Sequence, residues 1–248
     1  MAGPGVVLLT KPAGLPVFPP HGSPDGDCLL ARARARGALA DGAAWPPGFD
    51  GGIAHRLDTP TSGLVLAARS PADLALLRGW FRDGLLRKVY LFHSARSVPW
   101  STHSIDRPIA HDPRRKQRMV VQRGVATPHR GAWLPARTGL RRLGPAPGGT
   151  LWAATIETGV THQIRVHAAA LGLALTGDRL YGGGPPLSEA GDIPAFRLHA
   201  LFIDGPAGRW GAAPLPLDWP GRDSAIAQAA AAFGELSWMG TGETTFPP

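Results

Sequence analysis

Cysteine, lysine and tyrosine are scarce in this sequence, and long apolar runs are absent from it. Cys28 is the only cysteine in 248 residues, so no disulfide can form within the chain and no zinc site can be built from cysteines. No run of about 18 apolar residues is present, and the first residues lack the basic and apolar segments of a secretory signal. We therefore expect a cytoplasmic protein with no membrane partner.

Lysine is rare among the basic residues. The net charge is +8, and only three of the 26 basic residues are lysine, which leaves 23 arginines. Arginine binds phosphate through two parallel hydrogen bonds and stacks on bases, so a surplus of arginine favours a nucleic-acid partner. A chain rich in Ala, Gly, Arg and Pro is also typical of GC-rich coding DNA. Charge alone leaves both explanations open.

The segment His55–Gly63 places a histidine, an arginine and a carboxylate among turn-forming residues. Thr59-Pro60 and Ser62-Gly63 are turn dipeptides, and the apolar run 64–68 that follows predicts a buried strand. Asp58 is therefore expected on a loop at the edge of a strand, where reactive groups are often found. The alternative is an aspartate that only bonds its own backbone in a turn.

Short strands and helices alternate along the chain, without an internal repeat. We expect strands at 6–9, 64–69, 88–93, 119–121, 150–156 and 197–204, and helices at 27–36, 70–84, 161–171 and 221–236. The expected N-caps are Asp27, Ser70 and Thr161. Apolar residues of the second helix form one stripe, namely Leu74, Leu77, Phe81 and Leu85. We expect one domain over residues 1–220, followed at 221–248 by a helix and a loose tail.

The densest group of positive charge precedes the strand at 119–121. It comprises Arg114, Arg115, Lys116 and Arg118. A hairpin arm that lays its charged tip on a phosphate backbone has this pattern, and so does a solvated basic loop.

Two further residues have an unusual context. Tyr90 lies in a strand with apolar residues on both faces, where it is either a core aromatic with one hydrogen bond or a site residue. Arg165 falls in the early turns of a helix, where a cation opposes the helix dipole. An anion at that helix end would explain Arg165, and Asp58 is a candidate.

Four segments, taken in order, resemble the pseudouridine synthases of the RluA branch. They cover roughly residues 6–204 and are Lys11–Leu15, His55–Leu64, Lys88–Tyr90, and Thr161–His167 with Gly177–Gly182. The resemblance implies an α+β pseudouridine synthase fold, with a mixed, mostly antiparallel sheet, flanking helices and a central RNA-binding cleft. Some members carry a separate N-terminal RNA-binding module, which we expect to be absent here.

The resemblance also implies roles for individual residues. Asp58 is similar to the catalytic aspartate, Tyr90 to the active-site tyrosine and Arg165 to the arginine that pairs with the aspartate. Arg56 is similar to the arginine that fills the gap left by an extruded base. We expect RNA contacts from Arg56 and from His55, Arg114, Arg115, Lys116, Arg118, His162 and Gln163. The family usually has Gly-Arg-Thr-His-Gln-Ile-Arg, whereas this chain has Val160 in place of the first arginine.

The predicted activity is the isomerisation of uridine in structured RNA, ribosomal or transfer, to pseudouridine. A carboxylate nucleophile on a flipped-out uridine divides this reaction into two easier steps, and an arginine nearby keeps the carboxylate ionised. No cofactor and no metal is required. His162 and His167 are five residues apart on the expected helix and do not share a face as zinc ligands would. We expect a monomer.

Two other functions are considered. One is a catalytically idle RNA-binding or RNA-chaperone protein of the same fold, suggested by the basic surface and Val160. The other is a glycoside hydrolase or nucleosidase, which needs two facing carboxylates. Asp58 has no acidic partner nearby in sequence.

Overall fold

The computed structural model describes residues 4–39, 44–184 and 196–234, which fall into two compact units. The first unit contains the chain up to Lys88 together with residues 199–217, and the second contains residues 89–198 and 218–234. The expected loose tail at 235–248 lies outside the described residues. The expectation of a single domain over 1–220 stays a prediction.

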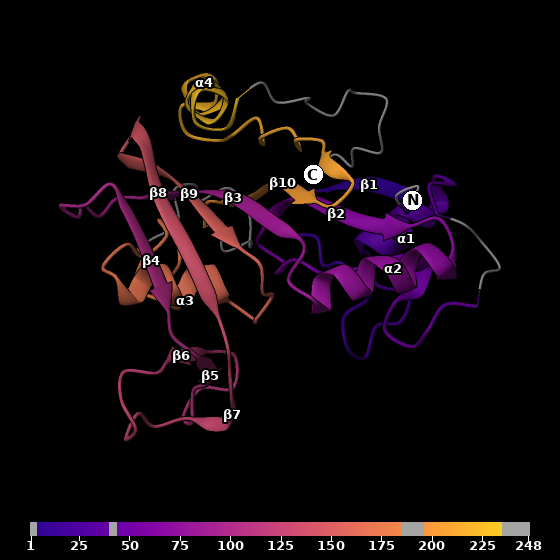
Figure 1. Cartoon of the computed structure of the whole chain (residues 1–248), viewed down its shortest axis with the longest axis horizontal. Helices are drawn as coiled ribbons and strands as arrows, with labels where there is room; N and C mark the ends of the chain where they lie inside the picture. Colours follow the sequence, from indigo (N-terminus) through magenta and orange to yellow (C-terminus); the bar gives the residue numbers. More distant parts are fainter. Residues whose placement is uncertain (1–3, 40–43, 185–195, 235–248) are drawn as a thin grey trace. The chain divides into compact units, whose positions relative to one another are not determined.

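The first unit is built on a small sheet. β1 (Val6–Lys11) pairs antiparallel with β2 (Ser62–Ala68), and β2 pairs parallel with β10 (Leu198–Gly205). β11 (Gly208–Trp210) returns antiparallel along β10 (Figure 1). The strands expected at 6–9, 64–69 and 197–204 are confirmed. Because β1 and β2 run opposite ways, Lys11 lies directly across from Gly63.

The first helix begins differently from the expectation. α1 (Leu29–Ala35) has Cys28 at its N-cap, where the sulfur accepts a hydrogen bond from the Ala31 N–H at 3.3 Å. Asp27, the expected cap, instead pairs with Arg32 at 2.7 Å. The prediction of the helix is confirmed and that of its cap is wrong. A short 3-10 turn, η1 (Asp50–Gly52), leads toward the segment that contains His55.

The second helix covers the sheet of the first unit. α2 (Pro71–Arg82) is capped by Ser70, whose hydroxyl accepts from the Asp73 N–H at 3.1 Å, as the sequence predicts. Leu74 and Leu77 are buried against β2 residues, and Phe81 packs on the same cluster. Leu85 lies beyond the helix and is 51% exposed, so its place in the stripe was wrong.

The second unit holds a larger, antiparallel set of strands. Their order is β3 (Arg87–Ser94), β9 (Gly149–Ile156), β8 (Arg137–Ala146) and β4 (Thr102–Asp106). Every residue of β3 after Arg87 is buried, which agrees with apolar side chains on both faces. The expected strands at 88–93 and 150–156 are confirmed.

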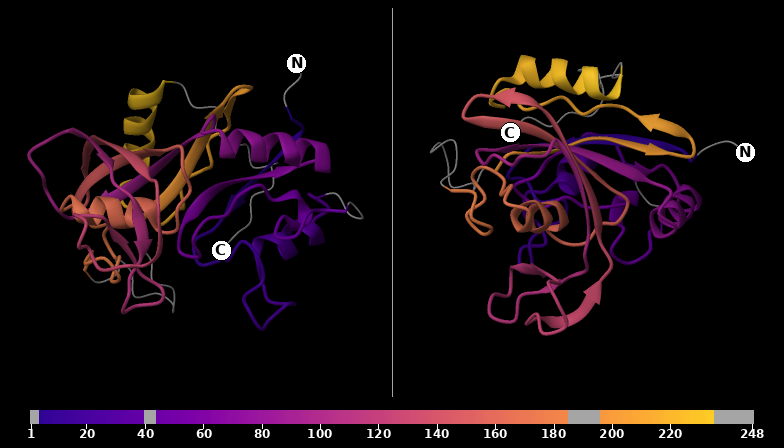
Figure 2. Two further views of the ribbon diagram at one scale, coloured as in Figure 1. Left: turned by 60° about the horizontal axis from the view of Figure 1, so that its bottom comes forward. Right: turned by 60° about the vertical axis from the view of Figure 1, so that its left-hand side comes forward.

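An arm of three short strands extends from β4 and β8 (Figures 1 and 2). In it, β5 (Ile109–His111) pairs antiparallel with both β6 (Met119–Val121) and β7 (Arg130–Leu134). Since β5 and β6 form a hairpin, the basic residues 114–118 occupy its connecting loop. The sequence left a hairpin arm and a solvated basic loop open; the structure shows the hairpin, and its contact with a phosphate backbone stays a prediction.

Two helices belong to the second unit. α3 (Gln163–Ala170) packs against β6 and β8, and α4 (Arg222–Phe233) packs against β8. α3 starts two residues later than expected, and Thr161 is not its cap. The structural neighbours described below and the mostly antiparallel pairing confirm the α+β class. Within the described ranges, no helix is long and apolar enough to span a bilayer.

Gly63 allows β2 and β10 to approach closely. Its φ is +115°, and an added Cβ would lie 2.1 Å from the carbonyl oxygen of Ala200. We expect Gly63→Ala to destabilise the protein by more than about 3 kcal/mol in urea-induced unfolding, because the strand pair must separate. The matched control is Gly84→Ala, where φ is +68° but no atom lies within 4 Å of the new Cβ. That variant should lose only about 1 kcal/mol, and equal losses in both variants would contradict the explanation.

Candidate functional site

Asp58 lies on a short loop between η1 and β2 in the first unit. The N–H of Thr61 donates to the Asp58 carbonyl at 2.9 Å, which closes a turn directly after the carboxylate. The carbonyl of Thr59 accepts two bonds, from the Gly14 N–H at 2.8 Å and from the Lys11 ammonium at 2.9 Å. The Asp58 side chain is half-buried. The expected loop at a strand edge is confirmed, and its backbone is fixed on both sides.

Lys11 is the residue that fastens this loop. Its side chain is completely buried, and besides Thr59 it donates to the carbonyls of Leu15 at 2.7 Å and Pro12 at 2.9 Å. Burial lowers the pKa of Lys11 from 10.5 to about 7, while the negative charge of Asp58 acts in the opposite direction. Sequence reasoning gave Lys11 no role beyond its motif. The sequence signal that could have pointed to this role is the spacing of Lys11 and Gly14, three residues apart. Both donate to the Thr59 carbonyl.

His55 and Arg56 precede Asp58 in the same loop and have different surroundings. The His55 Nε2 accepts a bond from the Leu66 N–H at 3.1 Å, and the ring lies 5.3 Å from that of Phe81. Burial and, to a smaller extent, the charge of Lys88 lower the pKa of His55 to about 3. The ring of His55 thus supports β2, and its predicted contact with RNA stays a prediction. Arg56 is exposed, and its role as a wedge stays a prediction.

Arg165 is held rigidly within the second unit. It lies in the first turn of α3 and makes two bonds to Asp178, from Nε at 2.7 Å and from a terminal nitrogen at 3.0 Å. The guanidinium lies 5.1 Å from the ring centre of Tyr181 and 4.3 Å from that of Phe196. Asp178 therefore supplies a negative charge that the sequence led us to expect near this arginine. The predicted pairing of Arg165 with Asp58 joins residues of different units and stays a prediction.

Tyr181 connects α3 with the arm. Its hydroxyl accepts a bond from the Met119 N–H at 2.9 Å and lies 2.9 Å from Nδ1 of His162. A phenol that accepts one bond can donate its own hydrogen to a ring nitrogen, so both contacts are satisfied together. Burial raises the pKa of Tyr181 to about 12, which keeps the hydrogen on the oxygen.

His162 has an unusual backbone. Its φ is +56°, and it is the one non-glycine residue with positive φ in the described ranges. Such a conformation costs on the order of 1 kcal/mol or more and is often found at functional sites. The contact with Tyr181 helps to hold it. His162 is half-buried, and its predicted contact with RNA stays a prediction.

Gln163 orders the turn before α3, which has no side-chain cap of its own. Its side-chain oxygen accepts from the Thr158 hydroxyl at 2.8 Å and the Val160 N–H at 3.2 Å. Its nitrogen donates to the Arg137 carbonyl at 2.9 Å and to Thr138. The amide is 3% exposed and fully bonded, and its contact with RNA stays a prediction. Val160 itself packs against the cluster that contains Met119 and Val166.

Tyr90 lies in the interior of β3 and is 6% exposed. Its burial agrees with both interpretations of the sequence, a core aromatic and a site residue. Its role at the site stays a prediction.

The basic tip of the arm is organised by Asp112. This carboxylate accepts from the backbone N–H groups of Arg114 at 2.8 Å and Arg115 at 3.2 Å, and it pairs with Arg118 at 3.3 Å. These bonds to backbone N–H groups, led by that of Arg114, hold the pKa of Asp112 below its usual value. The side chains of Arg114, Arg115 and Lys116 remain exposed, and Arg118 is half-buried. Their RNA contacts stay predictions.

In residues 4–39, 44–184 and 196–234, no group of three or more His, Cys, Asp or Glu side chains is placed to hold a metal ion.

The lowered pKa of Lys11 predicts a pH dependence of stability. Between about pH 7 and 10.5 the folded lysine is mostly neutral while the unfolded one still binds a proton. Stability should therefore rise with pH in this window, by up to about 1.4 kcal/mol per pH unit from this residue. Urea unfolding at pH 7, 8 and 9 should show this gain in the wild type relative to Lys11→Met. Lys116→Met, which removes an exposed lysine, should follow the wild type. Parallel curves for Lys11→Met and the wild type would contradict the pKa.

The Arg165–Asp178 pair predicts a large loss on removal of one partner. Asp178→Ala removes the carboxylate that pairs with the buried guanidinium of Arg165 and should lower the free energy of unfolding by about 3–5 kcal/mol. The control is Asp83→Ala, which breaks a pair with Arg82 whose side chains are 50% and 77% exposed. That change should cost at most about 1 kcal/mol. Similar losses in the two variants, measured by urea denaturation, would show that burial of the first pair does not matter.

Comparison with known proteins agrees with the ordered motifs. Residues 5–170 match the family model described as RNA pseudouridylate synthase. An uncharacterized RNA pseudouridine synthase of Chloroflexus aurantiacus is 36% identical over 84% of this chain and 62% of its own length. Ribosomal large subunit pseudouridine synthase D of Nitrosomonas europaea is 32% identical over 80% of this chain and 55% of that protein. The chain thus spans somewhat more than half the length of these two relatives.

Solved structures show the same fold. Human RNA Pseudouridylate Synthase Domain Containing 4 aligns with a TM-score of 0.61 at 20% identity, over 92% of this chain and 91% of that one. Human RNA Pseudouridylate Synthase Domain Containing 1 aligns with a TM-score of 0.59 at 23% identity, over 82% and 79% of the two chains. The resemblance to the RluA branch that the motifs suggested is confirmed, and with two thirds of its length matched this chain belongs to the RNA pseudouridylate synthase family.

Proposed function

We propose that this protein isomerises specific uridines in RNA to pseudouridine, with Asp58 as the nucleophile. Membership of the family supports the reaction. The observation that carries the assignment to Asp58 is its position on a loop whose next carbonyl, that of Thr59, is bonded by both Lys11 and Gly14. A nucleophile that must reach one atom of a flipped-out nucleotide needs such a fixed backbone.

The reaction breaks the bond between N1 of uracil and C1′ of ribose and forms a bond between C5 and C1′. The Asp58 carboxylate attacks either C1′ or the uracil ring, and this covalent step divides the isomerisation into two easier ones. After the base turns and rejoins through C5, the hydrogen on C5 must leave, and N1 gains a hydrogen. The formula of the nucleotide is unchanged, so no cofactor is consumed.

The remaining roles follow from the chemical needs of this reaction. Arg165, already oriented by Asp178, supplies the positive charge that keeps the Asp58 carboxylate ionised in a site that excludes water. Tyr90 positions the flipped base or receives the hydrogen from C5. Arg56, exposed beside Asp58, fills the space that the uridine leaves in the RNA.

Ribosomal RNA is the first substrate we propose, and transfer RNA the second. Several relatives carry names that assign them to the large ribosomal subunit, which supports this order. The basic tip of the arm offers Arg114, Arg115, Lys116 and Arg118 for phosphates on either RNA. We further propose that the protein is cytoplasmic, because its one cysteine, Cys28, is free and buried and therefore suits a reducing compartment. We also propose that it is a monomer and that it binds RNA in a central cleft.

A second candidate is an idle RNA-binding protein of the same fold. Val160 favours it, because an apolar side chain packed in a cluster stands where the family usually has an arginine. Tight RNA binding without product on any cellular RNA would support this candidate.

The decisive variant is Asp58→Asn, which removes the negative charge and keeps the size of the side chain. Wild-type protein incubated with total RNA from a strain that lacks it should restore pseudouridine at a defined site, mapped by sequencing. Asp58→Asn should restore none, a loss of at least about 1,000-fold in rate, while its thermal unfolding and RNA affinity stay near those of the wild type. The control is Asp83→Asn at an exposed position, which should restore the site fully. Product formation by Asp58→Asn would overturn the assignment.

A further inference from the structure

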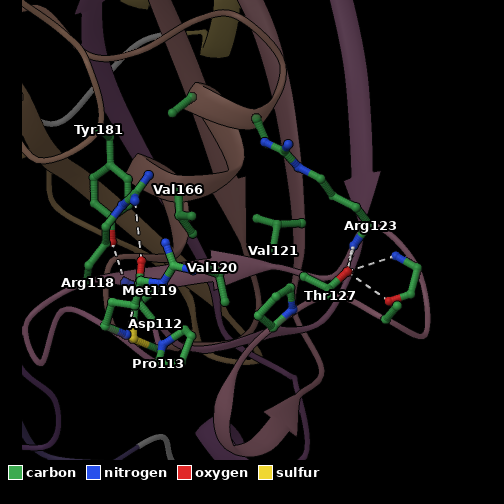
Figure 3. A pocket seen from close by; sticks show the side chains of 16 residues that line it. Asp112, Pro113, Arg118, Met119, Val120, Val121, Arg123, Thr127, Val166 and Tyr181 are labelled. Carbon is green, nitrogen blue, oxygen red and sulfur yellow. Dashed lines mark hydrogen bonds and ion pairs between the residues drawn. The ribbon is translucent and has the colours of Figure 1, made fainter.

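A groove lies in the second unit between the arm and the C-terminal half of α3, and two residues of the basic tip, Arg114 and Arg118, border it. It consists of two hollows, of about 850 Å³ and about 290 Å³. Val121, Arg123 and Ala170 line both hollows, so the two adjoin. Figure 3 shows the larger hollow, with Arg123 on one side and Tyr181 on the other. The volume of the larger hollow suits a small organic group.

The floor of the groove is apolar. Val166, Ala169 and Ala170 of α3 and Met119 and Val121 of β6 line the larger hollow, and all of these but Ala170 pack in one hydrophobic cluster. None of these side chains can form a hydrogen bond, so the floor suits a flat or apolar group and does not read its polar edge. Val121 and Ala170 continue the same floor into the smaller hollow.

The rim carries positive charge. Arg114 and Arg123 are exposed and line the larger hollow, and in the described part of the chain neither guanidinium has an ion-pair partner. Arg118 also lines it and is tied to Asp112. Thr127 orders the backbone at Arg123, since its hydroxyl accepts from the N–H groups of Arg123 at 2.9 Å and Gly124 at 3.0 Å.

Two carboxylates face the groove, and they leave the rim positive. Asp112 is occupied by two backbone N–H groups and Arg118. Asp106 lines only the smaller hollow, where Arg107 and Arg123 oppose its charge. Because α3 ends at Ala170, the negative end of its dipole points to this region. A bound anion would therefore lie on the arginines of the arm, and an uncharged group would lie against the helix.

We propose that this groove binds one unstacked nucleotide of the RNA, other than the uridine that reacts. Its base lies on the apolar floor by α3, and its phosphate is bound by Arg123 and Arg114. A nucleotide joins a flat base, which can lie on an apolar surface, to an anionic phosphate. The floor and the rim of the groove offer a surface for each. The inference rests on the proposed function for the identity of RNA as partner, and it extends the contact surface beyond the basic tip.

Two variants separate occupancy of the groove from general attraction of RNA. Arg123→Ala removes one phosphate contact, and Ala170→Phe fills the groove from an exposed position without changing the charge. The controls on α1 are Arg34→Ala and Ala35→Phe, which make the same two changes at exposed positions of the first unit. All four are made in the Asp58→Asn background, so that turnover does not affect binding.

The probe is a fluorescent single-stranded RNA 12-mer of random sequence that contains 4-thiouridine. We expect Arg123→Ala to weaken binding about 5- to 10-fold at about 0.1 M salt and to reduce the salt slope by about one. Ala170→Phe should weaken binding about as much with the salt slope unchanged, and the controls should stay within about twofold. Ultraviolet crosslinks in the Asp58→Asn protein should map to residues 119–128 or 166–170, and Ala170→Phe should remove them.

The outcomes are distinct. Loss of affinity in Arg123→Ala without any loss in Ala170→Phe would show attraction by surface charge alone and would overturn the inference, as would crosslinks only outside the groove. Pseudouridine formation by the wild type is measured separately on total RNA. If product forms while the groove variants bind normally, the groove fails and the proposed function stands. If RNA crosslinks to the groove and no pseudouridine forms, the proposed function fails and the groove as an RNA-binding site stands.

Discussion

The arrangement around Asp58 depends on one buried cation. Lys11 is completely buried, and its ammonium group donates three hydrogen bonds, to the backbone carbonyls of Pro12, Leu15 and Thr59. A buried ammonium is costly unless its hydrogens are bonded, and here all three are. Since two of these carbonyls belong to the turn after β1 and the third to the loop of Asp58, the lysine ties two irregular segments together. The bond from Lys11 to the Thr59 carbonyl therefore fixes the backbone next to Asp58 and with it the position of the carboxylate.

The second unit solves the same problem with different chemistry. Arg165 also lies in a buried site, but a carboxylate rather than carbonyls satisfies it, and two aromatic rings enclose the guanidinium. The bidentate pair fixes the plane of the guanidinium as well as its place, which an ammonium cannot achieve. Tyr181 then bonds Met119 at the start of β6. One phenol therefore fixes the arm and lies beneath the arginine.

The strands and the amphipathic helix α2 could be predicted because their signals are local. Short apolar runs mark β1 and β3, and Ser70, Pro71 and Asp73 mark the start of α2. The motif order likewise gave the family. The caps of α1 and α3 were missed, because the sulfur of Cys28 caps α1 in place of Asp27, and α3 begins after His162 without a side-chain cap. Either choice is compatible with the sequence, and packing decides between them.

The partners of the charged residues could not be predicted, since they depend on contacts between distant segments. Arg165 and Asp178 are separated by a turn whose path the sequence does not specify, and the bond from Lys11 to Thr59 joins positions 48 residues apart. The same limit applies to the hydrogen bonds of His55 and Gln163, whose contacts with RNA stay predictions. Both belong to motifs with exposed neighbours, and only the fold shows that their polar atoms are already bonded to Leu66 and to the turn before α3.

Arginine is used in two physically different ways in this chain. Arg165 is buried and bonded, so its charge is fixed at one place and is weakly screened by salt. Arg114 and Arg123 are exposed on an ordered backbone, where a phosphate can displace water and counterions from them. The net charge of the sequence does not separate these uses. Arg114 and Arg123 border an apolar floor made by α3 and β6. For RNA bound there, the contribution of the phosphate to affinity would fall with rising salt concentration, and the contribution of the base would not.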